Sequence, residues 1–323
     1  MMIGEALFKN GKNHLDLYLN YHCNLRCNHC FVGEKLEKRV EFEISEVRKI
    51  LEYSRSCGAT SVSLLGGEPT IYPFINEVIM YCSDLGYPEI KLVTNGMKPV
   101  RKISQIDSRY NKPTIVFSVD SCEPEIFERI RGRNTFSQLE KNIFYMLDKG
   151  YECGAILSVS KTNYKSVINT IQYLNSYNFA YVNIHYVNSI GFATDLDLVK
   201  IEDWFLIKKE IEKISQQVNI RIKFEDKFKS ASISKTSKCV LKNNVEGNVM
   251  IFPDNKVYRC ALFLDYGNLN SLYWNGSEIV PNEILTTEQT IASKSCNGCP
   301  MSSSILGNDT DYVLTCMYDK TCF

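Results

Sequence analysis

The stretch YHCNLRCNHC, residues 21–30, follows a predicted strand and carries three cysteines in the spacing C-x3-C-x2-C. Thiolates are the preferred ligands of iron–sulfur clusters, and a fourth cysteine closes a cubane cluster into an electron carrier. Three thiolates leave one iron open for chemistry. We therefore predict that Cys23, Cys27 and Cys30 hold a [4Fe-4S] cluster with an open iron site. A zinc knuckle or a chance group of buried thiols is the alternative.

A second motif stands at the end of the next predicted strand. The β-branched and apolar run SVSLL, residues 61–65, indicates a buried strand and leads directly into Gly66-Gly67-Glu68-Pro69. The glycines let backbone groups approach a ligand closely, and Glu68 offers a carboxylate to a cationic group. A Gly-Gly pair after a strand is often only a turn, so the inference of a ligand-binding site depends on both motifs together.

Together the two motifs resemble the signature of the radical S-adenosylmethionine (SAM) enzymes. In that family the amino and carboxylate groups of the methionine moiety occupy the open iron, and an electron cleaves a C–S bond of SAM. The resemblance implies SAM as a cofactor, with Gly66, Gly67 and Glu68 as the motif that binds its ammonium group. His29 departs from the pattern, because the family usually has an aromatic residue at that position.

The composition is that of an ordinary globular protein of 323 residues, with 37 basic and 37 acidic side chains. This balance argues against a nucleic acid or a membrane surface as the main partner, because both favour a basic excess. There is no signal peptide and no apolar run of bilayer length, which predicts a cytoplasmic protein. Thirteen cysteines in a cytosolic chain are better interpreted as metal ligands or catalytic thiols than as disulfides.

Strand-like and helix-like runs alternate up to about residue 224. The predicted strands cover residues 15–19, 61–65, 90–94, 114–119, 155–160 and 181–187. Six β/α units in series require a parallel sheet with right-handed crossovers, curled into a full or partial barrel, with chemistry at the carboxyl ends of the strands. We predict an α/β fold: a (β/α)6 partial TIM barrel over residues 1–225, which is the fold that the resemblance implies, and a small cysteine-rich α+β module over residues 226–323.

Polar residues at the other strand ends are further candidates. The resemblance implies that Asn95, Ser118 and Ser158 contact the ribose and carboxylate of SAM, and that Arg131, in a segment similar to one in peptide-modifying members, is a carboxylate partner. An ordinary turn, a capping group or a solvated loop is the alternative for each. Cys122 follows the fourth strand and is a candidate hydrogen-atom donor, although free cysteines are often simply buried.

Six cysteines follow residue 225. Residues 249–252 and 256–259 flank Pro253-Asp254-Asn255 and predict a β-hairpin, with Asn255 able to take a positive φ.

The spacing of the C-terminal cysteines resembles that of the twitch domain, a shortened SPASM domain that carries auxiliary clusters, although Asn255 replaces its usual glycine. The preferred ligands of one auxiliary [4Fe-4S] cluster are Cys239, Cys260, Cys296 and Cys299. A rival set is Cys296, Cys299, Cys316 and Cys322, and a zinc site is the alternative. Cys316 and Cys322 are otherwise a redox pair, hydrogen-atom donors or a loose tail.

The resemblance implies generation of a 5′-deoxyadenosyl radical, with an electron donor such as flavodoxin or ferredoxin. The first hypothesis is oxidation or crosslinking of a residue in a ribosomal peptide or protein. The second is oxidation or epimerisation of a small sugar or cyclitol, and the third is a noncatalytic Fe–S or zinc scaffold. The short lead before Cys23 leaves no room for the peptide-binding domain of many peptide maturases, which weighs against the first.

Overall fold

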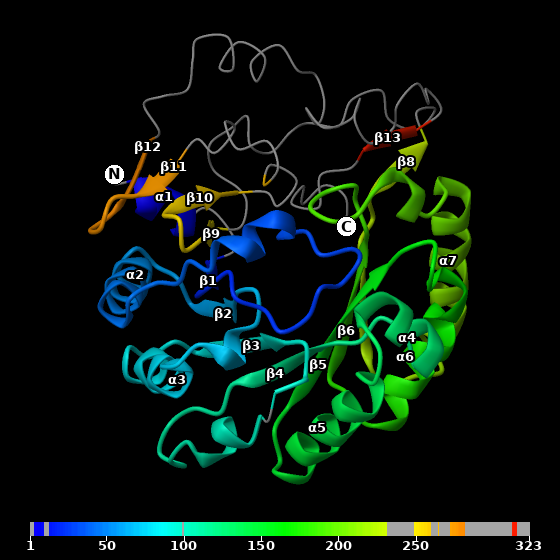
Figure 1. Cartoon of the computed structure of the whole chain (residues 1–323), viewed down its shortest axis with the longest axis horizontal. Coiled ribbons are helices and arrows are strands. Elements are labelled where there is room, and N and C mark those ends of the chain that lie inside the picture. Colours follow the sequence, from blue (N-terminus) through cyan, green and yellow to red (C-terminus); the bar gives the residue numbers. More distant parts are fainter. Residues whose placement is uncertain are drawn as a thin grey trace.

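The computed structural model of the protein describes residues 3–9, 13–98, 100–230, 249–259, 264, 272–281 and 312–314. Within these residues one sheet has eleven strands in the order β12-β11-β10-β9-β1-β2-β3-β4-β5-β6-β7, and a second sheet pairs β13 with β8. The large sheet is curved, and helices cover its outer side (Figure 1). The fold is therefore α/β, as the alternation in the sequence predicts.

Seven parallel strands form the main part of the sheet, and each pairs with the next one along the chain. They are β1 (His14–Tyr18), β2 (Ser61–Leu65), β3 (Glu89–Thr94), β4 (Thr114–Ser118), β5 (Cys153–Val159), β6 (Tyr181–Tyr186) and β7 (Arg221–Phe224). The six predicted strands are confirmed to within two residues at either end. The seventh, β7, was not predicted.

One of the outer helices precedes β1, and the others lie in the connections between successive strands. They are α1 (Ile3–Lys9), α2 (Ile44–Ser56), α3 (Ile75–Asp84), α4 (Pro124–Arg131), α5 (Phe136–Asp148), α6 (Val167–Ser176) and α7 (Ile201–Ile214), with short 3-10 helices at Gly33–Lys38, Pro69–Ile71, Val100–Gln105, Tyr164–Ser166 and Asp195–Asp197. In α2 the buried residues Val47, Ile50 and Leu51 lie on one face, as helical spacing requires. None of the helices in the described ranges is long and apolar enough to cross a membrane.

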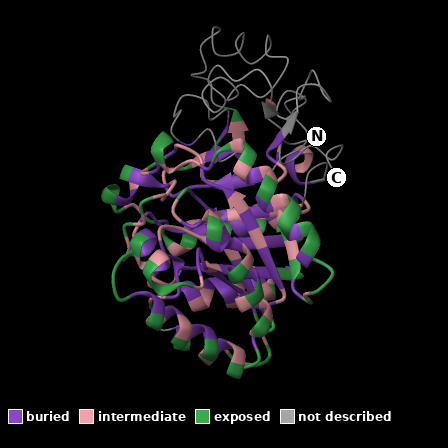
Figure 2. Ribbon diagram, turned by 90° about the vertical axis from the view of Figure 1, so that its right-hand side faces the viewer, coloured by how far each residue is buried: buried purple, intermediate pink, exposed green. Residues whose placement is uncertain are grey.

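The two faces of the sheet differ in chemistry. Val62 and Leu64 of β2 belong to the apolar core, which is buried inside the molecule (Figure 2). Ser61 and Ser63 point to the other face, because side chains alternate along a strand. There they lie 2.6 and 3.0 Å from the ring nitrogens of His14 on β1. The inner face is thus lined partly by polar groups, while the face toward the helices is apolar.

Four short strands extend the sheet beyond β1: β9 (Val249–Ile251), β10 (Lys256–Tyr258), β11 (Leu272–Trp274) and β12 (Ile279–Pro281). The second sheet is built from β8 (Phe228–Ser230) and β13 (Tyr312–Leu314). The strands β9 and β10 form the predicted hairpin, and Asn255 at its turn has φ 64°. Because β9 pairs in parallel with β1, the hairpin continues the same sheet. Phe252 stacks on Tyr18 with ring centroids 4.0 Å apart.

Candidate active site

The cysteine loop, residues 21–32, lies between the end of β1 and the first 3-10 helix. Cys23, Cys27 and Cys30 are half-buried free thiols. Burial, and to a smaller extent the charges of Glu68, Cys27 and Cys30, raise the pKa of the Cys23 thiol to about 12. The backbones of two of the three cysteines are linked, because Cys30 N donates to Cys27 O at 3.1 Å. Because their ligating form is the thiolate, binding of a metal must release protons.

The three thiols of the loop are candidate donors to a metal group. Within the described residues, no three Cys, His, Asp or Glu side chains converge closely enough to bind one metal ion. A cubane does not require such convergence, because each of its thiolates binds a different iron. Cys23, Cys27 and Cys30 stay the predicted ligands of a cluster, on the spacing of the sequence.

The Gly66-Gly67-Glu68 segment lies against the chain that enters the cysteine loop. Gly67 N donates to Asn20 O at 2.8 Å, and Glu68 N donates to His22 O at 2.7 Å. A Cβ atom on Gly67 would stand 2.2 Å from His22 O. Only glycine permits this approach, so the two motifs found in the sequence are in direct contact.

Glu68 is 1% exposed, and its carboxylate is held by the ends of two strands. Oε1 accepts hydrogen bonds from Thr70 Oγ1 at 2.6 Å and Thr94 Oγ1 at 2.7 Å, and Oε2 accepts from Asn95 N at 2.7 Å. Burial raises the pKa of Glu68, and these hydrogen bonds oppose the rise. Contact with the SAM ammonium stays a prediction. Oε2 is the atom with acceptor capacity to spare, since a carboxylate offers about four acceptor positions.

Asn95 links β3 to the cysteine loop. Its Nδ2 atom donates to Asn24 Oδ1 at 3.1 Å and lies 3.7 Å from Cys23 Sγ. Its Oδ1 atom accepts from Met97 N at 2.9 Å. The sequence predicted Asn95 as a SAM contact. The structure brings its side chain to the first cysteine, and the predicted contact with SAM stays a prediction.

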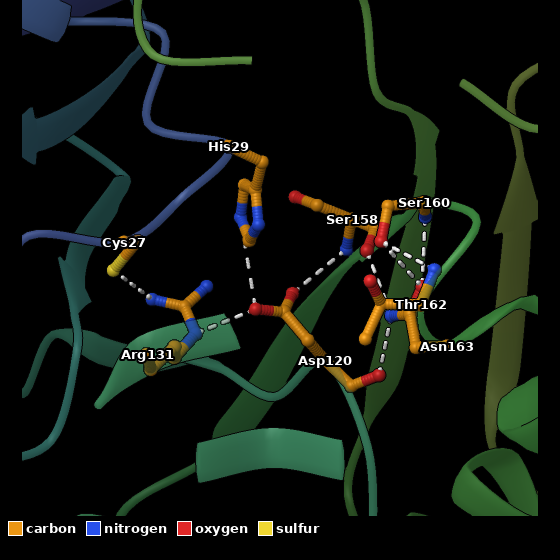
Figure 3. A network of polar contacts seen from close by, with 8 residues as sticks. All are labelled: Cys27, His29, Asp120, Arg131, Ser158, Ser160, Thr162 and Asn163. Atoms are coloured by element: carbon orange, nitrogen blue, oxygen red, sulfur yellow. Dashed lines mark hydrogen bonds and ion pairs between the residues drawn. The ribbon is translucent and has the colours of Figure 1, made fainter. Parts of the chain in front are cut away.

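A buried polar network joins the cysteine loop to the end of β4 (Figure 3). Arg131 Nε donates to Asp120 Oδ2 at 2.6 Å, and Arg131 Nη1 lies 3.8 Å from Cys27 Sγ. His29 Nε2 lies 3.6 Å from the same carboxylate oxygen. Ser158 N donates to Asp120 Oδ1 at 3.1 Å. Asp120 therefore holds together three elements that are far apart in the sequence.

The charges in this network are balanced. Burial alone would raise the pKa of Asp120, but the Arg131 guanidinium and His29 outweigh it and lower that pKa. Burial lowers the pKa of His29 and so favours its neutral form. Burial raises the pKa of Cys27, whereas Arg131 lowers it. A guanidinium beside Cys27 thus favours the thiolate that a cluster needs.

The predicted serines lie at neighbouring strand ends. Ser118 ends β4 and Ser158 lies in β5, and both are half-buried. Ser158 takes part in the network through its backbone, since its O also accepts from Asn163 Nδ2 at 2.9 Å. The predicted contacts of these two serines with SAM remain predictions.

A second charged group lies at the ends of β6 and β7. Glu225 Oε2 accepts from Tyr186 N at 2.9 Å and lies 3.6 Å from His185 Nδ1, and Glu225 Oε1 lies 3.8 Å from Lys227 Nζ. His185 is 39% exposed in its side chain and pairs in register with Ser158 of β5. An imidazole next to a carboxylate, one strand from the Asp120 network, is suited to bind a polar group.

Sequence reasoning missed Asp120, His185 and Glu225. Asp120 carried a signal, because it is a carboxylate that closely follows a predicted strand and comes shortly before Arg131. Glu225 had none, since it follows the unpredicted strand β7. Cys57, Cys82 and Cys153 are buried in the apolar core.

Cys122 follows β4 and lies next to α6. Its backbone N donates to Thr170 Oγ1 of α6 at 3.1 Å, and burial raises its pKa. These contacts are with a helix and not with the cysteine loop. Its role as a hydrogen-atom donor stays a prediction. All six C-terminal cysteines, Cys239, Cys260, Cys296, Cys299, Cys316 and Cys322, lie outside the described residues.

The chain is similar to known proteins in sequence and in fold. A sequence model of the Radical SAM superfamily matches residues 17–174. The antilisterial bacteriocin subtilosin biosynthesis protein AlbA of Bacillus subtilis is 24% identical over 185 residues, which cover 57% of this chain and 41% of AlbA. GTP 3′,8-cyclase of Mannheimia succiniciproducens is 30% identical over 145 residues, which cover 44% of this chain and 43% of the cyclase. The chain therefore spans about two fifths of the length of these relatives.

Among solved structures, Streptococcus suis SuiB bound to its precursor peptide SuiA superposes with a TM-score of 0.70 at 17% identity. The superposition covers 89% of this chain and 67% of SuiB. At this identity the likeness concerns the fold. A radical SAM domain implies a [4Fe-4S] cluster and SAM, in agreement with the cysteine loop and the Gly-Gly-Glu segment that lies against it.

Proposed function

Residues 17–174 form a radical SAM domain, so the chain is an enzyme, and from this premise we propose that it oxidises or crosslinks a residue of a ribosomal peptide or protein. One observation carries the proposal. The three-cysteine loop and the Gly66-Gly67-Glu68 segment are hydrogen-bonded to each other at the carboxyl edge of a parallel sheet. In α/β sheets of this kind, ligands bind at that edge.

Cys23, Cys27 and Cys30 would hold the cluster. Glu68 would bind the SAM ammonium through Oε2, and Asn95, Ser118, Ser158 and Arg131 would contact its other polar groups. When bound, the cluster and SAM supply a 5′-deoxyadenosyl radical that abstracts an unactivated hydrogen. The protein binds and orients the reactants and excludes water from them. The guanidinium of Arg131 favours the thiolate of Cys27, and Asp120 holds that guanidinium in place.

The proposal includes a division of the chain into two parts. We infer a (β/α)6 partial barrel over residues 1–225 and a twitch-like or SPASM-like module over residues 226–323. Cys239, Cys260, Cys296 and Cys299 would bind an auxiliary [4Fe-4S] cluster that accepts the substrate electron. Reconstituted protein would then hold about eight iron atoms per chain. Iron near four with one zinc would contradict the auxiliary cluster. A flavodoxin or ferredoxin would supply the electron, in the cytoplasm.

A peptide substrate is supported by the fold comparison. SuiB, whose fold covers most of this chain, was solved with its precursor peptide, and AlbA is a bacteriocin biosynthesis protein. The exposed imidazole of His185, beside Glu225 at the ends of β6 and β7, offers a polar group to a substrate next to Ser158.

A second candidate is a small molecule. The 30% identity with a GTP 3′,8-cyclase favours a nucleotide over the sugar or cyclitol that the sequence suggested, because it is a specific likeness over residues of the same domain. The noncatalytic scaffold is disfavoured by the radical SAM domain.

Anaerobic incubation of reconstituted protein with SAM and a reductant would test the substrate. The probes are GTP and the peptides encoded by short reading frames beside the gene. We expect a peptide to lose two hydrogens without gaining deuterium from deuterated water, and GTP to be unchanged. Conversion of GTP would overturn the peptide proposal. One deuterium in a peptide of unchanged oxidation level would indicate epimerisation, with Cys122, Cys316 or Cys322 as the candidate hydrogen donor.

A further inference from the structure

A loop at the far side of the sheet touches the cysteine loop. This β6–α7 loop, residues 188–194, follows β6, whereas the cysteine loop follows β1. Phe192 N donates to Cys30 O at 3.0 Å, and the same oxygen accepts from Gly33 N at 3.1 Å. Figure 1 shows the blue segment after β1 reaching across to the green segment beside β6. The segments that follow β1 and β6 are thus joined at the third cysteine.

Two glycines make this contact possible. Gly33 and Gly191 have φ of 59° and 69°, a region that side chains other than glycine rarely adopt. A Cβ on Gly191 would stand 2.2 Å from Cys30 O, and a Cβ on Gly33 would stand 2.6 Å from Gly191 Cα. These neighbours are backbone atoms, so the overlap cannot be relieved by turning a side chain. The two backbones meet without room for a methyl group.

The β6–α7 loop is fixed at both ends. At its start, Asn188 Oδ1 accepts a hydrogen bond from the buried Lys227 of the segment after β7. At its end, Thr194 N donates to Asp197 Oδ2 at 2.8 Å. Ala193 is 7% exposed. These contacts attach the loop to neighbouring segments at both of its ends.

The backbone of Cys30 is consequently hydrogen-bonded through both its N–H and its carbonyl group. Its N–H donates to Cys27 O at 3.1 Å, and its carbonyl receives the bond from Phe192. We propose that the β6–α7 loop is a positioning element for the cluster, with Gly191 and Phe192 fixing the backbone of Cys30 and so the place from which its thiolate would bind iron. The inference rests on the proposed function insofar as Cys23, Cys27 and Cys30 bind the cluster. Gly191 is a positioning residue, because it would act through Cys30.

The test compares Gly191→Ala with Gly150→Ala. Gly150 has nearly the same φ, 67°, but the nearest atom to its added Cβ is Lys112 Nζ at 4.0 Å. Both variants carry the backbone cost, and only the first displaces Cys30. Loss of groups that support metal ligands typically weakens metal binding about 10- to 100-fold. We expect Gly191→Ala to release iron to a chelator faster than the wild type by about this factor. We also expect that adding SAM changes the electron paramagnetic resonance signal of the reduced cluster differently in Gly191→Ala and in the wild type.

Gly150→Ala should match the wild type in both measurements. If Gly191→Ala matches it too, the positioning role is wrong even though the protein binds its cluster. A wild type that binds no cluster at Cys23, Cys27 and Cys30 would instead overturn the proposed function.

Because Gly191→Ala could fail to fold, hydrogen exchange on the wild type provides a second measurement. Cluster reconstitution should slow exchange at Phe192 and leave Gly150 unchanged. Equal exchange at Phe192 before and after reconstitution would overturn the proposal.

Discussion

At the scale of single residues, the Asp120–Arg131 pair makes the strongest stability prediction. Both side chains are almost fully buried. Asp120→Asn would leave a buried guanidinium without its counter-charge, which costs about 3–5 kcal/mol of unfolding free energy. Urea denaturation of the protein without its cluster measures this. Glu37→Gln removes the exposed partner of Arg26 and should cost less than about 1 kcal/mol. Equal effects of the two variants would contradict the network.

Glu68 gives a binding prediction. Glu68→Gln replaces one acceptor oxygen by an amide donor, which cannot accept from Asn95 N or from an ammonium group. Losing a charge-assisted hydrogen bond costs roughly 1.5–3 kcal/mol, or about tenfold to a hundredfold in SAM affinity. Calorimetry on cluster-loaded protein measures it, with iron content as the control. Unchanged affinity at full iron content would leave Glu68 with only its role in holding Thr70, Thr94 and Asn95.

Glu225 gives a pH prediction. Burial alone would raise its pKa, but Lys227 and His185 lower it below its usual value. A carboxyl with a lowered folded-state pKa stabilises the fold above its unfolded pKa, and that stability is lost as the pH falls through the folded pKa. The urea concentration at the midpoint of unfolding should therefore decrease as the pH is lowered from about 5 to about 2. In Glu225→Gln this decrease should be less steep. The same dependence of the midpoint on pH in both proteins would show that the charge of Glu225 does not stabilise the fold.

At the scale of elements, the hairpin β9–β10 is predicted to stabilise the cysteine loop side of the sheet. Phe252 is fully buried and stacks on Tyr18, in a cluster that includes Met250 and Tyr258. Phe252→Ala should lower the unfolding free energy by about 3–5 kcal/mol. Tyr273→Ala, at a half-exposed position of β11, should have a much smaller effect. A small effect of Phe252→Ala in urea denaturation would argue against docking of the hairpin on β1.

The elements differ in how far the sequence predicted them. The strands β1 to β6 were predictable because their apolar runs are short and bounded by turns. The strand β7 was not, because Arg221 and Lys223 are exposed and only alternate residues pack on the core. The hairpin was predicted from its turn residues, but its parallel pairing with β1 depends on contacts far apart in the sequence.

The site was predictable only in part for the same reason. Spacing identified the three cysteines and the Gly-Gly-Glu segment. It did not reveal that Asp120 holds Arg131 beside Cys27, or that Gly191 lies against Cys30, because these contacts exist only after the sheet has formed.

At the scale of the whole molecule, one arrangement defines the site. The carboxyl ends of the parallel strands surround the cysteine loop, which is held by the Gly-Gly-Glu segment, by Asn95, by Arg131 and by the β6–α7 loop. All of these supports meet at a set of three thiols that can bind three of four irons. This arrangement would orient SAM and a substrate at the same edge of the sheet.

The most direct test of this claim is reductive cleavage of SAM by the reconstituted protein. With a reductant and no oxygen, the wild type should convert SAM into 5′-deoxyadenosine, and the triple variant Cys23→Ala, Cys27→Ala, Cys30→Ala should form none while retaining the iron bound elsewhere. Formation of 5′-deoxyadenosine by the triple variant at the wild-type rate, or none by a wild type that holds its cluster, would contradict the account.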